Sequence, residues 1–578
     1  MPDLSQTQPF AFTCEGGLVK SRSTFIMQPG QALELINFEP DMQGGYRRIS
    51  GHRKHVNHIV PQTSSSSEKV LMVAFFNNNI VAARGEKIWT SASTELATEL
   101  ASGTAMTGSG TISVDSTSGF SSSGTIQINS EIFTYGAKTA TAFTSVTRAT
   151  SSTTAASHSI DDAVSESWTV RDISRTNAGK YNFERFNFDG NDKLIVVDGT
   201  NDPTVFNTSY TATDITESSV EGAKYVVAFR EHMFFAGMSS TPQEVVFSQP
   251  FDEDAFSSGS GAGSVKVDDT IVGLKVFRDS LFIFCENRIF KVTGSSLTDF
   301  AIVPVTRNIG CINGDTIQEF AGDLIFLGPD GLRTVAGTAR IGDVELGTIS
   351  SEVHVLFDEN IKNSEVFDSV VIPDKTQYRI FFSKDGQAES STKGVVCVMK
   401  GDRFEFGELK GVKPSCTDTY IKAGDVMVLH GGFNGYIYRQ EKGNDFSGTA
   451  IMGQYRSPDL TFQDPGIRKH MQRVIANYKP EGTLDADLFI RYDYEDKNSA
   501  RPAAYALDSS NVIAQYGSAT YGSSSANAGT YGGVSEPLIR QPVEGSGFAV
   551  ALRVNDGGTT APYSLKGFQL EYQLGARR

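Results

Sequence analysis

Pairs of short apolar runs, each pair separated by a polar turn, recur from Glu68 to about Arg439. Examples are "DKLIVVDGTNDPTVF", "KYVVAFREHMFFAGMSS" and "LKVFRDSLFIFCENRIFKVTG". Apolar runs that end in Gly, Asn or Asp turns are typical of β-hairpins. Successive pairs begin about 40 to 50 residues apart, which is the spacing of β-propeller blades. The pattern therefore predicts a β-propeller over residues 68–447.

The two runs of each unit differ in a way that suits a blade. The first run is almost wholly apolar, as in "LFIFC", which favours a strand buried on both faces. The second alternates more, as in "RIFKVTG", which favours a strand nearer the outside. Six or seven units predict six or seven blades. A pair of β-sandwiches built from the same hairpins is the alternative. It stays open because the propeller is supported by the spacing of the repeat and not by a sequence motif.

Three segments depart from the repeat. Residues 98–163 are rich in Ser, Thr and Gly but alternate, as in "TIQINSEIFTY", which predicts a small β subdomain inserted into a propeller loop. Residues 448–578 contain longer alternating runs and predict a C-terminal antiparallel β-sandwich. Residues 1–67 are interpreted as an N-terminal arm with lead-in strands. The whole chain is predicted to be all-β.

Composition agrees with this fold class and excludes some functions. The chain has 38 Phe and 19 Tyr, and aromatic side chains suit a pleated, half-buried surface. Its net charge of -16 argues against a protein that binds nucleic acid by neutralising phosphates. Five scattered cysteines without CxxC spacing predict neither a disulfide framework nor a zinc site. No secretory signal and no apolar stretch of about 18 residues is visible, so we expect a soluble protein without a membrane span.

The sequence contains no recognisable catalytic or cofactor-binding motif. The patterns GxxxxGK[ST], HExxH and GxSxG are all missing. His52, His55 and His58 are three residues apart, and steps of three alternate faces on a strand, so they are not expected to share a metal ion. We therefore expect no enzyme activity, no cofactor and no metal site.

A cationic stretch near the N-terminus stands out in this acidic chain. Phe38 to His55 reads "FEPDMQGGYRRISGHRKH", and its candidate interface residues are Tyr46, Arg47, Arg48, Arg53 and Lys54. The stretch is interpreted as a short strand whose cationic surface docks on an acidic neighbour, either the adjacent subunit or this chain's own acidic faces. Arg47 and Arg48 would point to opposite faces of a strand, so one can pair within the subunit and the other across an interface. The alternative is an exposed edge strand whose charges keep it soluble.

Tyr-Gly repeats at Tyr516, Tyr521 and Tyr531 form a second candidate interface. Exposed tyrosines can form a stacking platform for single-stranded nucleic acid or sugars. The alternative is a long hairpin whose tyrosines pack on a sheet while glycine permits close backbone approach.

Several stretches resemble one family of phage proteins. The run "GGLVKSRSTFIMQPGQALELINFEPDMQGGYRRISGHRKH" and the later run "SPDLTFQDPGIRKHMQRVIANYK" are similar to tail nozzle proteins of short-tailed, podovirus-type double-stranded DNA phages. That family is related to the packaged-DNA stabilisation proteins. The Tyr-Gly repeats and the Ser/Thr-rich insertion resemble the same family.

The resemblance implies a structural virion protein, assembled in the host cytoplasm, that forms the distal tail tube. Such a protein retains packaged DNA and gates its ejection into the host. The resemblance also implies a hexameric ring, contact with the phage adaptor (head-to-tail connector) protein, and contact with tail fibres or spikes. Genomic DNA would pass through the lumen without specific binding, and an acidic wall suits this because it offers phosphates no fixed counter-charge.

Two other functions remain open at this stage. A receptor- or carbohydrate-binding propeller would present aromatic and acidic clusters at its loop tips. A propeller glycosidase would require convergent carboxylates.

Overall fold

The computed structural model is mostly β-sheet, and the predicted all-β class is confirmed. It describes residues 6–56, 58–61, 69–91, 97–101, 110–173, 175–177, 179–296, 299–335, 348–384, 392–422, 424–482, 484–496, 498, 501–508 and 538–577. The helical elements in these ranges are α2 (His354–Asn363) and the short 3-10 turns η1 (Thr24–Ile26), η2 (Ser258–Ser260), η3 (Gly314–Thr316), η4 (Ser351–Val353), η5 (Pro373–Lys375) and η6 (Asp493–Glu495). No helix in these ranges is long and apolar enough to cross a membrane.

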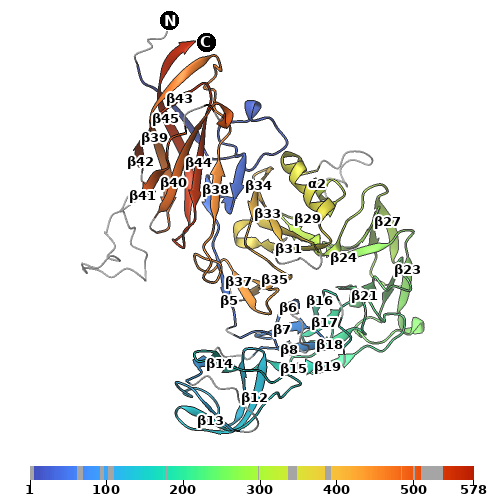
Figure 1. Ribbon diagram of the computed structural model, residues 1–578. Coiled ribbons are helices and arrows are strands. Elements are labelled where there is room, and N and C mark those ends of the chain that lie inside the picture. The colour runs from blue at the N-terminus through green and yellow to red at the C-terminus, as the bar shows by residue number, and fades with distance from the viewer. Residues whose placement is uncertain are drawn as a thin grey trace.

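A β-propeller occupies the middle of the chain, and its antiparallel sheets follow one another around a ring (Figure 1). In the described residues the sheets are β6 (Val70–Phe76), β7 (Asn79–Arg84), β8 (Lys87–Thr90) and β15 (Thr169–Asp172); β16 (Asn182–Phe186), β17 (Lys193–Val197), β18 (Thr204–Phe206) and β19 (Ala212–Asp214); β20 (Tyr225–Phe229), β21 (His232–Ala236), β22 (Glu244–Phe247) and β23 (Gly263–Lys266); β24 (Ile271–Phe277), β25 (Ser280–Cys285), β26 (Ile289–Thr293) and β27 (Ala301–Thr306); β28 (Gln318–Phe320), β29 (Asp323–Gly328) and β30 (Gly331–Thr334); β31 (Val366–Ile372), β32 (Gln377–Ser383), β33 (Lys393–Lys400) and β34 (Arg403–Leu409); and β35 (Cys416–Lys422), β36 (Asp425–Gly431), β37 (Ile437–Gln440) and β5 (His52–Lys54). The innermost strand of each sheet contacts the next sheet around the ring; β24 makes this contact through η3. The ring is closed because β35 of the last sheet contacts β6 of the first.

Tight turns explain why these segments fold as hairpins. Asn77 and Asn78 join β6 to β7 with φ of 41° and 72°, and Arg230 and Glu231 join β20 to β21 with φ of 49° and 61°. Positive φ at both central residues gives a turn whose twist matches the twist of its strands. All residues of β6 are buried, as expected for a strand between two neighbouring sheets.

The insertion between β8 and β15 folds as a small closed barrel. Its sheet runs in the order β10 (Gly110–Ser113), β13 (Ala142–Thr147), β12 (Glu131–Lys138), β11 (Gly124–Ile128), β14 (Ala163–Glu166) and β9 (Ala97–Glu99). A bridge between Leu100 and Val114 and a hydrogen bond from Ala101 N to Ser113 O join the end of β9 back to β10. Buried apolar side chains such as Phe133 and Phe143 fill the interior, so the barrel has its own core.

The C-terminal domain is a sandwich of two sheets. One sheet contains β3 (Phe38–Pro40), β4 (Tyr46–Arg48), β45 (Tyr563–Arg577), β39 (Ile467–Pro480) and β42 (Leu538–Pro542), with β1 (Gln8–Thr13) beside β45 and β43 (Ser546–Gly547) beside β39. The other contains β2 (Glu34–Ile36), β38 (Gly453–Arg456), β44 (Val550–Asp556), β40 (Asp485–Tyr492) and β41 (Tyr505–Asp508). Buried side chains alternate with exposed or partly buried ones along β40, and one core contains residues of both sheets.

The N-terminal arm ties the propeller to the sandwich. β2 pairs antiparallel with β38 of the sandwich and parallel with β34 of the propeller, so one nine-stranded sheet runs through both. Further along the arm, β5 pairs with β37 and completes the last propeller sheet. The arm is therefore part of both domains. Figure 1 shows the sandwich and the barrel at opposite ends of the molecule, with the ring between them.

Candidate functional site: the joint between propeller and sandwich

The cationic stretch of the arm lies where the propeller meets the sandwich. β3 and β4 form a hairpin, and β4 also pairs with β45. Gly44 and Gly45 turn this hairpin with φ of 83° and 89°, a conformation that residues with a side chain rarely adopt. At Gly45 a Cβ would lie 2.4 Å from the carbonyl oxygen of Leu565, so only glycine allows the hairpin to approach β45 this closely.

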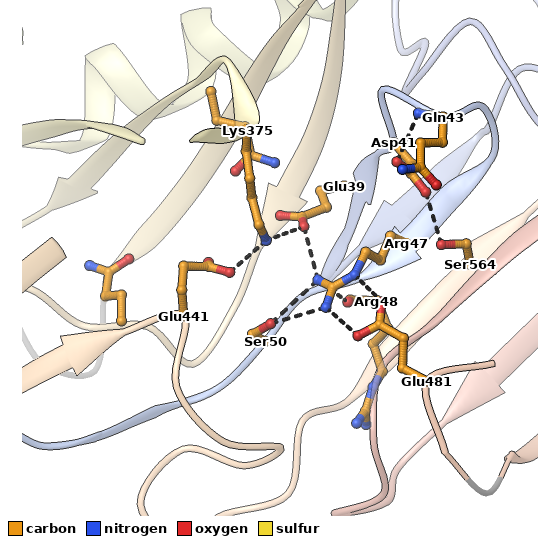
Figure 2. Close-up of polar contacts among 12 residues, drawn as sticks. Glu39, Asp41, Gln43, Arg47, Arg48, Ser50, Lys375, Glu441, Glu481 and Ser564 are labelled. Atoms are coloured by element: carbon orange, nitrogen blue, oxygen red, sulfur yellow. Dashed lines mark hydrogen bonds and ion pairs between the residues drawn. The ribbon is translucent and has the colours of Figure 1, made fainter. Parts of the chain in front are cut away.

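Arg47 connects the arm to the sandwich. Its guanidinium donates to both carboxylate oxygens of Glu481 at 2.6 and 2.7 Å and to Glu39 Oε1 at 3.2 Å (Figure 2). Burial lowers the pKa of Arg47, but the bonds to Glu481 and the charges of Glu39 and Glu441 outweigh it and raise the pKa. Arg47 is therefore a permanent cation held by carboxylates of its own subunit.

The carboxylates around Arg47 also bind two propeller cations. Glu39 is 2% exposed and accepts from Lys375 Nζ at 2.6 Å and from Arg379 Nη2 at 3.1 Å. Glu441 accepts from the same two cations at 2.5 and 2.6 Å. Burial raises the pKa of Glu441, but Lys375 and Arg379 outweigh it and lower this pKa to about 2. With Arg47 and Glu481, these residues form the joint network, three cations and three anions in contact.

Arg48 points to the other face of β4, as predicted, but also remains inside the subunit. It is 0% exposed, pairs with Asp556 at 3.2 Å and donates to the carbonyl oxygen of Gly558 at 3.1 Å. Tyr46 is fully buried too, and its hydroxyl donates to the carbonyl oxygen of Gly30 at 2.7 Å. The geometry therefore gives no support to the expectation that Tyr46 and Arg48 contact another subunit, nor to the alternative of an exposed edge strand, because their partners lie within the chain.

The remaining candidate interface residues lie elsewhere. Arg53 and Lys54 are exposed on β5, where the Lys54 ammonium lies 3.6 Å from the centre of the Tyr436 ring. They are on the outermost strand of the last propeller sheet and stay available to a partner. The repeats at Tyr516, Tyr521 and Tyr531 lie outside the described residues.

Sequence reasoning missed the partners of Arg47. Glu39 is only eight residues from it, but Glu481 is 434 residues away, and no local pattern links such positions. The one usable signal is Arg379, a charged residue inside the apolar run "QYRIFFS". A buried Arg is rare unless it is paired.

The histidines of the arm do not converge. His52 packs on Phe446 with ring centres 5.0 Å apart, whereas His58 meets Trp168 edge-on at 5.8 Å in a separate cluster. In the part of the chain that the structure describes, no group of three His, Cys, Asp or Glu side chains is arranged to hold a metal ion.

Ion pairs line the centre of the propeller. A cavity of about 300 Å³ lies there, lined by the innermost strands. Lys180 contacts Asp368 and lies 3.2 Å from Asp315, and Arg185 contacts Asp418. Burial lowers the pKa of Lys180, but the two carboxylates outweigh it and raise the pKa. Asp315, Asp368 and Asp418 therefore form ion pairs with cations of the propeller itself.

The comparisons with known proteins identify no family. No family model and no curated protein matches the chain. Solved structures that match include Raptor from Chaetomium thermophilum. The match has 8% sequence identity and a TM-score of 0.35, and it covers 68% of this chain and 29% of that chain. They also include Hsv2 from Kluyveromyces lactis, at 9% sequence identity and a TM-score of 0.27, where the match covers 59% of this chain and 98% of that chain. A quinonprotein alcohol dehydrogenase-like protein from Bacteroides thetaiotaomicron matches at 8% sequence identity and a TM-score of 0.29, and the match covers 60% of this chain and 66% of that chain.

Proposed function

We propose that this chain is a structural subunit of a phage tail nozzle, which retains packaged DNA and gates its ejection. In this proposal six copies form a ring below the adaptor protein, and tail fibres or spikes attach to its outside. The genome passes through the lumen without specific binding, and the chain catalyses no reaction.

The observation that carries the proposal is the location of the residues that resemble nozzle proteins. The run "NFEP…GGYRRI" supplies Glu39, which pairs with Lys375 and Arg379 of the propeller, and Arg47, which pairs with Glu481 of the sandwich. The ion pairs of Glu39 and Arg47 thus lie at the boundary between the two domains, which the shared sheet and core also cross. A subunit of fixed shape suits the wall of a tube that must resist the pressure of packaged DNA.

The narrow propeller centre constrains where DNA would run. A cavity of about 300 Å³ is at the lower end of small-molecule pockets and cannot admit a DNA duplex. In this proposal the DNA channel therefore lies between subunits. An acidic chain suits this arrangement, because phosphates are not held by fixed cations.

Immunogold labelling of released phage particles with an antibody against this chain tests the proposal. We expect label only at the distal end of the tail. Label on peripheral fibres or spikes would instead support a receptor- or carbohydrate-binding propeller, which glycan-array binding would then examine. An absence of label on all particles would overturn the assignment to the virion.

A further inference from the structure

The inserted barrel is attached to the propeller through one apolar cluster. The cluster contains Trp89 of β8, Trp168 just before β15 and Ile132 of the barrel. Around it, Gln127 of the barrel donates to the carbonyl oxygen of Ile59 at 2.6 Å and accepts from the backbone of Trp168 at 3.3 Å. We call this contact the barrel joint.

His58 is the ionisable ring of the barrel joint. It is 6% exposed, and it meets Trp168 edge-on with ring centres 5.8 Å apart. Within the described chain, neither of its ring nitrogens has a hydrogen-bond partner, and the indole nitrogens of Trp89 and Trp168 also have none. A neutral imidazole fits this apolar setting, and a charged one does not.

Within the described residues, no carboxylate is hydrogen-bonded to His58. Charged and titratable groups on the elements packed around the barrel joint include Arg84, Lys87, Arg171, Asp172, Asp418, Lys422, Asp425, His430, Arg439, Glu131 and Glu166. The carboxylates of Asp172, Asp418 and Glu131 are bound by arginines. Burial is the dominant influence on His58, and it lowers the pKa of this histidine to about 4.

We propose that His58 makes the barrel joint acid-sensitive, so that protonation of its imidazole releases the barrel from the first propeller sheet. The barrel can separate without unfolding because its sheet is closed and it has its own core. This inference does not depend on the proposed function.

The direction of the pH effect follows from linkage. Well above pH 6.5 the imidazole is neutral whether the joint is closed or open. As pH falls from about 6.5 towards 4, the open state binds a proton that the closed state excludes. Acid therefore favours the open state, and the effect is complete near the pKa of the closed state.

The two tryptophans provide a specific probe. They are the only two in the chain, and both lie in the barrel joint. We expect acrylamide quenching of their fluorescence in the full-length protein to rise several-fold between about pH 7 and pH 4, while far-UV circular dichroism keeps its β signal. His58→Phe and His58→Gln, which cannot be protonated in this range, should both lack the rise.

His430→Phe is the matched control, because His430 is also buried but its ring packs on His52 and Tyr438 instead of on a tryptophan of the barrel joint. It should keep the wild-type quenching profile. The proposal is overturned if the wild-type quenching does not rise above pH 4, or if either His58 variant that retains its β signal behaves as wild type. It is also overturned if the circular dichroism of the wild type collapses together with the rise.

Discussion

Arg48 is a buried cation whose charge is balanced within one subunit, and this makes it sensitive to replacement. If Arg48→Met removes the guanidinium, the carboxylate of Asp556 stays buried without its partner. Breaking a buried ion pair in this way costs about 3 to 5 kcal/mol. We expect a loss of this size in the free energy of unfolding, measured by urea denaturation.

Lys54→Met is the control, because Lys54 belongs to the same cationic stretch but is exposed. It should change stability by no more than about 0.5 kcal/mol. The double variant Arg48→Met/Asp556→Leu should recover much of the loss, since no unpaired charge remains. Equal losses in Arg48→Met and Lys54→Met would contradict this account.

Glu131 fixes a loop of the barrel and should make that barrel acid-sensitive in a second pH range. Its carboxylate accepts from Arg148 at 2.7 and 2.9 Å and from the backbone nitrogen of Ala156 at 2.9 Å, and it lies 2.9 Å from His158 Nε2. Burial raises the pKa of Glu131, but these contacts outweigh it and lower the pKa from 4.5 to about 2. Between pH 4.5 and pH 2 the unfolded barrel therefore binds more protons than the folded barrel. The stability of the folded barrel falls as pH falls through this range.

Thermal unfolding of the full-length protein between about pH 5 and pH 3 measures this effect. In the wild type we expect the barrel transition to move to lower temperature on acidification. Glu131→Gln should already unfold at lower temperature at pH 5 and show a smaller shift, while Glu99→Gln, at an exposed position, should follow the wild type. Parallel pH profiles for the wild type and Glu131→Gln would refute the role of this carboxylate.

At the scale of the elements, the β3–β4 turn separates two effects of glycine. Gly44 and Gly45 both have positive φ, but a Cβ at Gly44 would meet nothing within 4 Å, whereas one at Gly45 would meet Leu565 O at 2.4 Å. Gly44→Ala should cost about 1 kcal/mol, from the backbone conformation alone. Gly45→Ala should cost clearly more, because β4 must move away from β45. Equal losses on urea denaturation would show that close approach does not matter here.

The elements that could be predicted from the sequence are those determined by residues close together in the chain. Hairpins such as β6–β7 depend on apolar runs and a turn of Asn77 and Asn78, all within a short window, so the propeller could be inferred. β2 and β5 could not be assigned in this way, because their partners β38 and β37 lie about 400 residues away and leave no mark on the local pattern. The same distance hid Glu481 as the partner of Arg47, although the opposite orientations of Arg47 and Arg48 were predicted correctly.

At the scale of the whole molecule, β2 decides whether the propeller and the sandwich behave as one body. It lies between β34 and β38, so the hydrogen-bonded sheet continues from one domain to the other. Leu35 in its centre is 0% exposed and belongs to a core that includes Tyr378 of the propeller and Leu552 of the sandwich. The sheet, the core and the joint network thus cross the same boundary, and we expect the two domains to unfold cooperatively.

Differential scanning calorimetry of Leu35→Asp tests this cooperativity. In the wild type we expect one transition for propeller and sandwich together, beside that of the barrel. Leu35→Asp buries an unpaired carboxylate at the boundary and should split the shared transition into two, since each domain retains its remaining core. Ile421→Asp, on a propeller strand where the side chain is 57% exposed, should leave it single. If the wild type already shows separate transitions for propeller and sandwich, the arm does not couple them, and a tube built from this subunit would bend at the joint.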